Sequence, residues 1–372
     1  MKIKQLFLMA AVGLLATASL TSCEDILGEW SRPTPAEVTP AASVAVTGIT
    51  LSDTELEIAK GSTKTLDVTV APDNATDKTV TWSSSDEAIA TVADGVVTAV
   101  AAGTATITAT ANDGSGVTAT CSVTVLALFS VSADTKVIFS PGNLQYNSSE
   151  ATYKWRFAEH QYDYVGAWDT STWVDLFGWG AWTGDATNPI NTSTTTGDYS
   201  WADADFNQES KLADESQRGY DWRTLTSAEW TYLFNTRSGA TVKSTANVRC
   251  TMATINTDAT AVKGMILFPD GKEFADTEAT WGTLNNYSDY TTQCTSAQWT
   301  ALADKGCVFL PAAGYRNGTT ANSAGTDGRY WSSTVYDASL AYRVGFYSGS
   351  LTPADGSNRY YGFSVRLVRP AE

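Results

Sequence analysis

Short segments that alternate between apolar and polar residues dominate the chain, and their period of two predicts β-strands. The last segment is YYGFSVRLVR, residues 360–369. Its alternating positions are Phe363, Val365 and Leu367 on one side and Ser364, Arg366 and Val368 on the other. This pattern is typical of a half-buried strand. Chain ends fray unless the fold holds them, so we expect this strand to pair inside a sheet.

Two segments instead carry apolar residues at helical spacing and predict short helices. In each, a Thr is followed three residues later by Glu or Gln, the capping-box pattern that begins a helix. The capping pairs are Thr226 with Glu229 and Thr295 with Gln298, and the apolar residues that follow are Trp230, Leu233, Phe234, Trp299 and Leu302. Gly306 suits the end of the second helix. The runs 265–271 and 307–316, which follow the two helices, are typical of strands.

Residues 44–126 read as one folded unit of short Thr- and Val-rich strands. Turn signals stand at Lys60-Gly61, Asp94-Gly95, Ala102-Gly103 and Asp113-Gly114. Strands at this spacing predict a β-sandwich. The motifs VTWSSSD, ATV, GVV and GTATI fall between residues 80 and 107, and with them the unit resembles the group 2 bacterial Ig-like domain over its whole length. The resemblance implies a stalk, with Trp82 filling the space between two sheets.

Residues 127–372 form a larger, aromatic-rich unit. It opens with an expected β-meander at residues 137–157. The run 162–207 is rich in Trp and Gly and lacks periodicity. A loop of that length inside a domain is usually functional or mobile, so we expect it to serve one of those roles.

Several short motifs carry a resemblance for this second unit: WRTLT at 222–226, FPDG at 268–271, FLPAAG at 309–314, YWSST at 330–334 and GFSVR at 362–366. With them, most of residues 127–372 resembles the C-type-lectin-like fold, and within it the Fibrobacter-type major paralogous domain and the variable-protein domains of Bacteroides. The resemblance implies a mainly β chain, an Ig-like β-sandwich followed by an α+β C-type-lectin-like domain. It implies that the last strand pairs near KVIFSPG, residues 136–142, and that the C-terminal stretch can be diversified by a retroelement.

The N-terminus indicates export. Lys2 and Lys4 precede an apolar run too short for a membrane span, and the run ends in Leu20-Thr21-Ser22-Cys23. This ending resembles a bacterial lipobox, which implies a signal peptide at 1–22 and a lipidated Cys23; an ordinary signal peptide is the alternative. Residues 23–43 then form a Pro-rich tether. Glu24 and Asp25 resemble the surface-export signal of Bacteroides-type lipoproteins, so we expect an outer-membrane lipoprotein that faces outward.

The net charge limits the classes of binding partner, and the cysteine content limits the number of disulfides. The net charge of −16 disfavours nucleic acid and anionic lipid as partners of the folded part. The membrane is reached only through the lipid anchor. Cys121 is expected to be buried in an Ig strand. Cys250, Cys294 and Cys307 allow at most one disulfide, and Cys294 and Cys307, which flank the second helix, are one of several possible pairs.

The sequence favours a protein that is not an enzyme. Formylglycine-generating enzymes share the resembled fold, but they need a reactive Cys pair near the C-terminal end, which this chain lacks. His160 is the single histidine, has no catalytic motif around it and is expected to be exposed. A paired-carboxylate glycosidase stays open. No cofactor is assigned; calcium is left open because five aspartates could ligate it, namely Asp185, Asp198, Asp203, Asp205 and Asp221.

The stretch between YWSST and GFSVR is rich in Tyr, Ser, Asn and Arg. Tyr supplies large contact area at low entropic cost, and the small polar residues supply adaptable hydrogen bonds. The predicted ligand-binding residues are Tyr336, Asp337, Tyr342, Arg343, Tyr347, Asn358, Arg359 and Tyr360. The structural alternative is that several of these tyrosines cover the hydrophobic core and bind no ligand. We therefore expect a recognition domain for a glycan or a surface protein, with a structural subunit of a surface assembly as the first alternative and a glycan-active enzyme as the second.

Overall fold

The computed structural model describes residues 42–166, 172–182, 189–199, 205–206, 208–284, 287 and 289–371. The predicted signal peptide, Cys23 and nearly all of the tether lie outside the described residues. Within those residues, no helix has the length and apolar character needed to cross a membrane.

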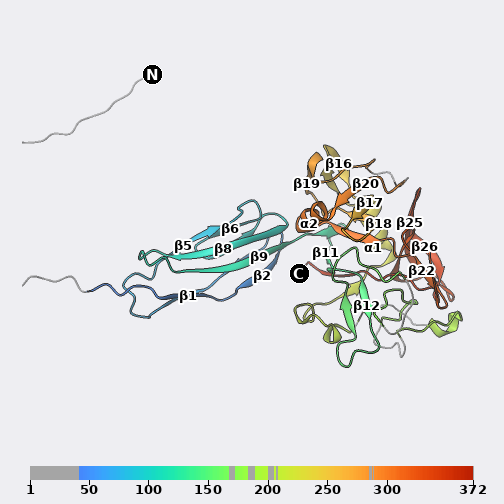
Figure 1. The fold of residues 1–372 in the computed structure, drawn as a ribbon, viewed down its shortest axis with the longest axis horizontal. Coiled ribbons are helices and arrows are strands. Elements are labelled where there is room, and N and C mark those ends of the chain that lie inside the picture. Colours follow the sequence, from blue (N-terminus) through green and yellow to red (C-terminus); the bar gives the residue numbers. More distant parts are fainter. Residues whose placement is uncertain are drawn as a thin grey trace, which may run out of the picture. The chain divides into compact units, whose positions relative to one another are not determined.

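The first folded domain is built from nine strands (Figure 1). They are β1 (Gly48–Leu51), β2 (Glu55–Ala59), β3 (Thr63–Thr65), β4 (Val68–Ala71), β5 (Val80–Ser84), β6 (Ala90–Ala93), β7 (Val96–Ala99), β8 (Gly103–Ala111) and β9 (Thr118–Leu126). Three sheets have the orders β2-β9-β8-β5, β3-β7-β6 and β1-β4. β2 runs parallel to β9, and the other pairs are antiparallel.

In the longest strands of this domain, alternating apolar and polar residues place every second side chain in its core, as expected. Along β8 every second side chain is buried, and Ile107 meets Cys121 of β9 inside the core. Cys121 is fully buried, as predicted. The hairpin between β6 and β7 turns at Asp94 and Gly95, both with positive φ, as the Asp-Gly signal indicated. Trp82 packs against this core but is only partly buried, so it does not fill the core to the degree predicted.

The C-terminal part contains eighteen further strands among its described residues. The strands are β10 (Phe129–Ser130), β11 (Lys136–Phe139), β12 (Leu144–Tyr146), β13 (Trp155–Phe157), β14 (Arg223–Thr224), β15 (Ala240–Val242), β16 (Thr245–Val248), β17 (Cys250–Asn256), β18 (Ala261–Leu267), β19 (Glu273–Phe274), β20 (Thr292–Thr295), β21 (Val308–Pro311), β22 (Tyr315–Asn317), β23 (Thr320–Asn322), β24 (Gly328–Val335), β25 (Leu340–Tyr347), β26 (Ser350–Asn358) and β27 (Leu367–Pro370). The larger sheets have the orders β10-β11-β27-β14, β20-β17-β18-β21, β16-β15-β19 and β24-β25-β26.

Both predicted helices are confirmed. α1 (Ser227–Asn235) begins at a capping box of Thr226 and Glu229, and α2 (Ser296–Asp304) at one of Thr295 and Gln298. Their predicted inward residues are buried: Trp230, Leu233 and Phe234 on α1, and Trp299 and Leu302 on α2. Gly306 follows α2 with a φ of 88°, the left-handed conformation that ends a helix. Both helices therefore form where local capping and an apolar face agree.

The terminal strand pairs as predicted, but its environment differs. β27 lies between β11 and β14, with Ile138 opposite Arg369 and Thr224 opposite Leu367. The half-buried prediction is wrong, because Ser364 and Arg366 are as fully buried as their apolar neighbours. Val365 and Leu367 belong to one core cluster and Val368 to another. Residues 363–368 are therefore covered by core on both sides, and the regular strand begins only at Leu367, later than the predicted strand.

The Trp- and Gly-rich run is the second correction. The parts of it that the structure describes are largely core, since Leu176, Phe177, Trp179 and Trp182 are buried. Phe177 bridges to Phe363 of the terminal segment, and the Trp179 indole N–H donates to the Ser332 carbonyl at 2.8 Å. This run is therefore a structural segment where it is described, and the expectation of a functional or mobile loop is wrong for residues 172–182.

Candidate functional site

The predicted binding residues gather on and around the sheet of β24, β25 and β26, but they do not share one face. On β25, Val344 and Phe346 point into the core cluster that also holds Trp230 and Leu233 of α1. Ala341, on the opposite side of the strand, belongs to the cluster around Phe363. Tyr342 and Arg343 follow the same alternation, and so lie on opposite sides of the sheet.

The α1 side of the sheet carries a tyrosine pair, of which Tyr336 is exposed and Tyr342 is half-buried. Tyr336, which follows β24, is 51% exposed, and its ring centroid is 4.8 Å from that of Tyr342. Gly356 lies opposite Tyr342 in the register, and a Cβ there would come within 3.1 Å of the Tyr336 ring. The missing side chain therefore makes room for this ring. Tyr342 also lines a pocket of about 330 Å³ whose other wall is α1, including Thr231 and Tyr232.

The opposite side of the sheet carries charged pairs among aromatic rings. The Arg343 guanidinium contacts the Asp355 carboxylate at 2.6 Å and donates to Ser357. Burial lowers the pKa of Arg343, and Asp355 opposes that shift. Arg329 pairs with Asp327 at 3.1 Å, and its guanidinium lies 4.0 Å from the centroid of the Tyr315 ring. These half-buried cations can recognise acceptor groups, but each already has a partner.

Two predicted residues have structural roles instead. Arg359 is buried; its guanidinium donates to the carbonyls of Asp337, Leu340 and Tyr199 and lies 4.7 Å from the Trp179 ring centroid. Because the side chain is 5% exposed and is held by these partners, the structure places Arg359 inside the domain and not on a binding surface. The Asp337 carboxylate accepts hydrogen bonds from the N–H groups of Ser339 and Leu340 and so holds the turn between β24 and β25.

The remaining predicted residues lie at the ends of the sheet. Asn358 is the last residue of β26, opposite Leu340. Tyr360 is half-buried, with its ring centroid 4.8 Å from that of Tyr361. Tyr347 ends β25 and is 51% exposed. The structure therefore brings together Tyr336 with Tyr342 on one side, and separates this pair from Tyr347 and Tyr360.

Tyr347 lines a second pocket, of about 500 Å³, that the sequence did not indicate. Its wall includes Tyr290 and Lys263, whose ammonium lies 5.4 Å from the Tyr290 ring centroid. Burial raises the pKa of Tyr290, and Asp327 adds to the shift. The Tyr290 hydroxyl donates to the Thr326 carbonyl at 2.6 Å. Aromatic rings, an ammonium and carboxylates thus meet beside the predicted residue.

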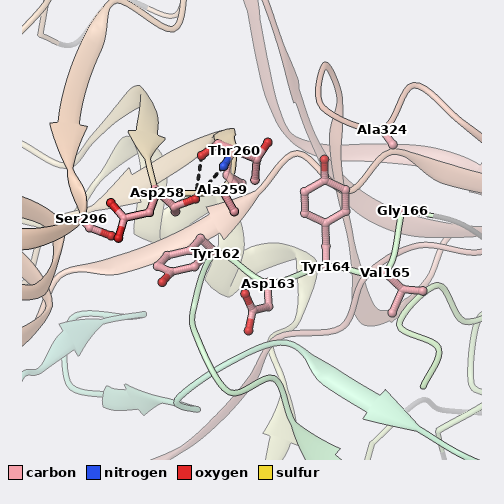
Figure 2. Close-up of a pocket in the computed structure, with 12 residues that line it drawn as sticks. Tyr162, Asp163, Tyr164, Val165, Gly166, Asp258, Ala259, Thr260, Ser296 and Ala324 are labelled. Atoms are coloured by element: carbon pink, nitrogen blue, oxygen red, sulfur yellow. Dashed lines mark hydrogen bonds between the residues drawn. The ribbon is translucent and has the colours of Figure 1, made fainter. Parts of the chain in front are cut away.

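The largest of these pockets, of about 790 Å³, lies away from the sheet (Figure 2). It is lined by Tyr162, Asp163 and Tyr164, by the turn between β17 and β18 that holds Asp258, and by Ser296 at the start of α2. Figure 2 shows Asp258 and Ser296 beside the Tyr162 ring, with Tyr164 directed toward Ala324. Burial raises the pKa of Tyr162, and the neighbouring carboxylate of Asp163 raises it further. Sequence reasoning missed this pocket because its walls come from four separate segments.

The described residues were also compared with the needs of a metal site and of a reactive thiol. Within the described ranges, no three His, Cys, Asp or Glu side chains are grouped so that they could hold a metal ion. Asp185 and Asp203 of the calcium set lie outside those ranges. Cys121, Cys250, Cys294 and Cys307 are buried free thiols. Burial raises the pKa of Cys250 to about 11 and that of Cys294 to about 12. The possible disulfide between Cys294 and Cys307 is not formed. His160 is exposed, as predicted.

Two segments match protein-family models. Residues 45–123 match the bacterial Ig-like domain (group 2), and residues 281–368 match a domain of unknown function, DUF8237. The first segment covers nearly all of β1–β9. The second segment includes α2 and the whole β24–β26 sheet. The first match confirms the Ig-like resemblance, whereas the second assigns no activity.

Three curated relatives share parts of the chain. An Ig-like virion protein of Serratia phage KSP90 is 47% identical over 123 residues, which are 32% of this chain and 45% of that protein. An alpha-L-arabinofuranosidase of Bifidobacterium longum is 50% identical over 71 residues, 19% of this chain and 7% of the enzyme. A lacto-N-biosidase of Bifidobacterium bifidum is 41% identical over 118 residues, 31% of this chain and 10% of the enzyme.

The chain thus spans less than half the length of each of these relatives, so their activities do not transfer to it. The Ig-like part is supported by the family model that matches residues 45–123 and by the phage relative, whose own name is Ig-like. The chain therefore carries a group 2 bacterial Ig-like domain at residues 45–123, followed by a mainly β part that bears the candidate sites.

Proposed function

We propose that this chain is a non-enzymatic surface lipoprotein of the outer membrane. In this proposal Cys23 carries the lipid anchor, and the Ig-like domain acts as a spacer. The C-terminal part is a C-type-lectin-like recognition domain for a glycan or a surface protein. The pairing of β27 with β11 supports the fold assignment, because it joins the two ends of this part of the chain.

The observation that carries the proposal is where apolar side chains are exposed. Four large apolar residues of the described C-terminal part are exposed, and three of them, Val335, Tyr336 and Tyr347, belong to β24, β25 or the turn between them. The fourth is Tyr153. Tyr336 and Tyr347 lie at opposite ends of the β24–β25 pair, so each offers its own exposed ring. Exposed aromatic rings are characteristic of binding surfaces. Tyr rings can stack on a sugar face or fill a protein interface, so both partner classes fit.

A surface polymer built by edge-to-edge strand pairing is less favoured. In the part of the chain that the structure describes, β26 is the edge of its sheet and pairs with β25. It contains Pro353, which has no N–H to donate, and its register with β25 is interrupted by an irregularity near Gly345. Proline and bulges at sheet edges prevent pairing with another chain. The β24–β26 sheet is therefore better suited to bind through side chains.

Alanine at the exposed tyrosines should weaken binding. We expect Tyr336→Ala and Tyr347→Ala each to lower affinity for the ligand by about tenfold, because truncation of an interface aromatic removes a large contact area. The measurement is binding of the purified chain to an array of glycans and host glycoproteins, with and without EDTA. Tyr153→Ala is the matched control, since this exposed tyrosine lies against Arg218 and away from the sheet.

Unchanged binding in both sheet variants would contradict the proposed surface. Concentration-dependent polymers of the chain, with no binding to any glycan or glycoprotein, would favour the structural alternative. Turnover of a polysaccharide that is lost on a single carboxylate change would favour the enzyme.

The lipid anchor gives a separate prediction. Cys23→Ala should abolish incorporation of labelled fatty acid and move the protein from the membrane fraction to the soluble fraction, because stable anchoring depends on the acyl chains. Protease treatment of intact cells then reports whether the wild-type chain faces outward. Retention of label in the variant would show that Cys23 is not the lipidated residue.

A further inference from the structure

The pocket of Figure 2 is assembled from segments that the fold holds rigidly. Its first wall, residues 162–166, is fixed at both ends. The Gln161 side chain accepts from the Phe309 N–H at 2.9 Å and from the Arg366 guanidinium at 2.7 Å. At the other end, the Val165 N–H donates to the buried Asp175 carboxylate at 2.9 Å. A wall held from behind in this way presents its side chains in one arrangement.

The opposite wall is a tight turn between β17 and β18. The Thr257 hydroxyl donates to the Thr260 carbonyl at 2.7 Å and accepts from the Thr260 N–H at 3.0 Å, the contacts dashed in Figure 2. Asp258 sits inside this turn and is exposed. For the Asp258 carboxylate no hydrogen bond or ion pair is found in the part of the chain that the structure describes. It is therefore available to a ligand.

Two aromatic rings line the pocket, Tyr162 beside Asp258 and Tyr164 toward Ala324 (Figure 2). Tyr162 and Tyr164 are half-buried, and both pack against the core cluster of Phe309 and Trp299. One side of each ring is thus supported by the core while the pocket side is open (Figure 2). Asp163 adds a second carboxylate. Its Oδ2 accepts a hydrogen bond from the backbone N–H of His160 at 3.0 Å. The rings supply an apolar platform, and the carboxylates supply acceptors beside it.

The charge of the pocket selects the class of ligand. Among the described residues, its lining contains two aspartates and no Lys, Arg or His. A carboxylate or sulfate group in the ligand would therefore be repelled, whereas hydroxyl groups would form charge-assisted hydrogen bonds. The volume of about 790 Å³ falls within the range of small-molecule sites.

We propose that this pocket binds a ring of a neutral saccharide, with Tyr162 stacked on the sugar face and Asp258 accepting from sugar hydroxyls. Ser296 lines the same pocket and lies beside Asp258 in Figure 2. The inference rests on the proposed recognition function. It names a second site, separate from the Tyr336 and Tyr347 surface, and the ligand class that this site selects.

The test is titration of the full chain with neutral oligosaccharides, monitored by saturation-transfer NMR and calorimetry. Sialylated and sulfated oligosaccharides and tetramethylammonium are measured in parallel. We expect saturable binding of neutral sugars only. Tyr162→Ala and Asp258→Asn should each weaken it by about tenfold, since each removes one main contact. Tyr162→Phe keeps the ring and should stay within about twofold of the wild type.

Matched controls separate this site from the rest of the domain. Tyr153→Ala and Asp134→Asn change an exposed tyrosine and an exposed aspartate outside the pocket, and both should bind like the wild type. Thermal unfolding of each variant checks that the fold is intact.

The outcomes distinguish the two proposals. Failure of every neutral sugar to bind, or binding of tetramethylammonium alone, overturns this inference while leaving the sheet surface to be judged by its own variants. Sugar binding that is unaffected by Tyr162→Ala and Asp258→Asn also overturns it. Sugar binding that depends on Tyr162, together with unchanged ligand binding in the Tyr336 and Tyr347 variants, supports this pocket and contradicts the sheet.

Discussion

Replacement of Trp179 by alanine is expected to lower the free energy of unfolding of the C-terminal part by about 3–5 kcal/mol, the range for truncation of a buried aromatic residue. The Trp179 side chain is fully buried, and its indole N–H donates to the Ser332 carbonyl. The variant would leave a cavity, an unsatisfied buried carbonyl, and an Arg359 guanidinium without its aromatic neighbour.

Urea unfolding of the full chain, followed by tryptophan fluorescence, measures this loss. Eleven of the thirteen tryptophans lie after residue 127, so the signal reports mainly on the C-terminal part. Trp173→Ala is the matched control from the same run. Trp173 is only half-buried, with the Arg156 guanidinium 4.0 Å from its ring centroid, and its truncation should cost about 1 kcal/mol. Equal losses in the two variants would contradict the assignment of Trp179 to the core.

The second large effect concerns the pH dependence of stability at Asp175. Burial raises the pKa of this carboxyl to about 6. Its Oδ2 accepts from the Val165 N–H, and its Oδ1 has no hydrogen-bond partner among the described residues. The folded-state pKa lies above the unfolded value, so the protonated form favours folding. This contribution is fully present below about pH 4 and is lost as the pH rises through 6.

Asp175→Asn removes the ionisation and keeps an acceptor for Val165. From pH 4 to pH 8, we expect the stability of the variant relative to wild type to rise by about 3 kcal/mol, the equivalent of two pKa units. Urea unfolding of both proteins across this range gives the difference. Asp134→Asn, at an exposed aspartate, is the matched control. If the stability difference between Asp175→Asn and wild type does not change with pH, the pKa of Asp175 is not raised in the folded protein.

Local signals predicted the elements that depend on neighbouring residues. The two capping boxes placed α1 and α2 because the bonds that begin a helix join residues three apart. The Asp94-Gly95 turn formed because a tight hairpin needs positive φ at both positions. The pairing of the last strand with residues near Val137 followed from the resemblance of the motifs to a known fold, and the register confirms it.

The same local signals misjudged what covers each face. Alternation marks Ser364 and Arg366 as polar positions, but it does not say whether the rest of the chain lies over them. Arg366 is buried because its guanidinium meets Gln161 and Asn143, 205 and 223 residues away. The run around Trp179 has no period because it is buried outside any regular strand or helix, and this absence of period resembles that of a loop.

For the candidate sites, too, some features followed from the sequence and others only from the tertiary structure. The sequence by itself determined a mainly β chain with an Ig-like domain, the positions of both helices, and a tyrosine-rich stretch between residues 336 and 361. Only the tertiary structure decided that Tyr342 and Arg343 lie on opposite sides of one sheet, that Arg359 is internal, and that Tyr162 meets Asp258 and Ser296 in one pocket. The physical reason is that burial and pocket walls depend on contacts between residues far apart in the chain, which composition and periodicity do not encode.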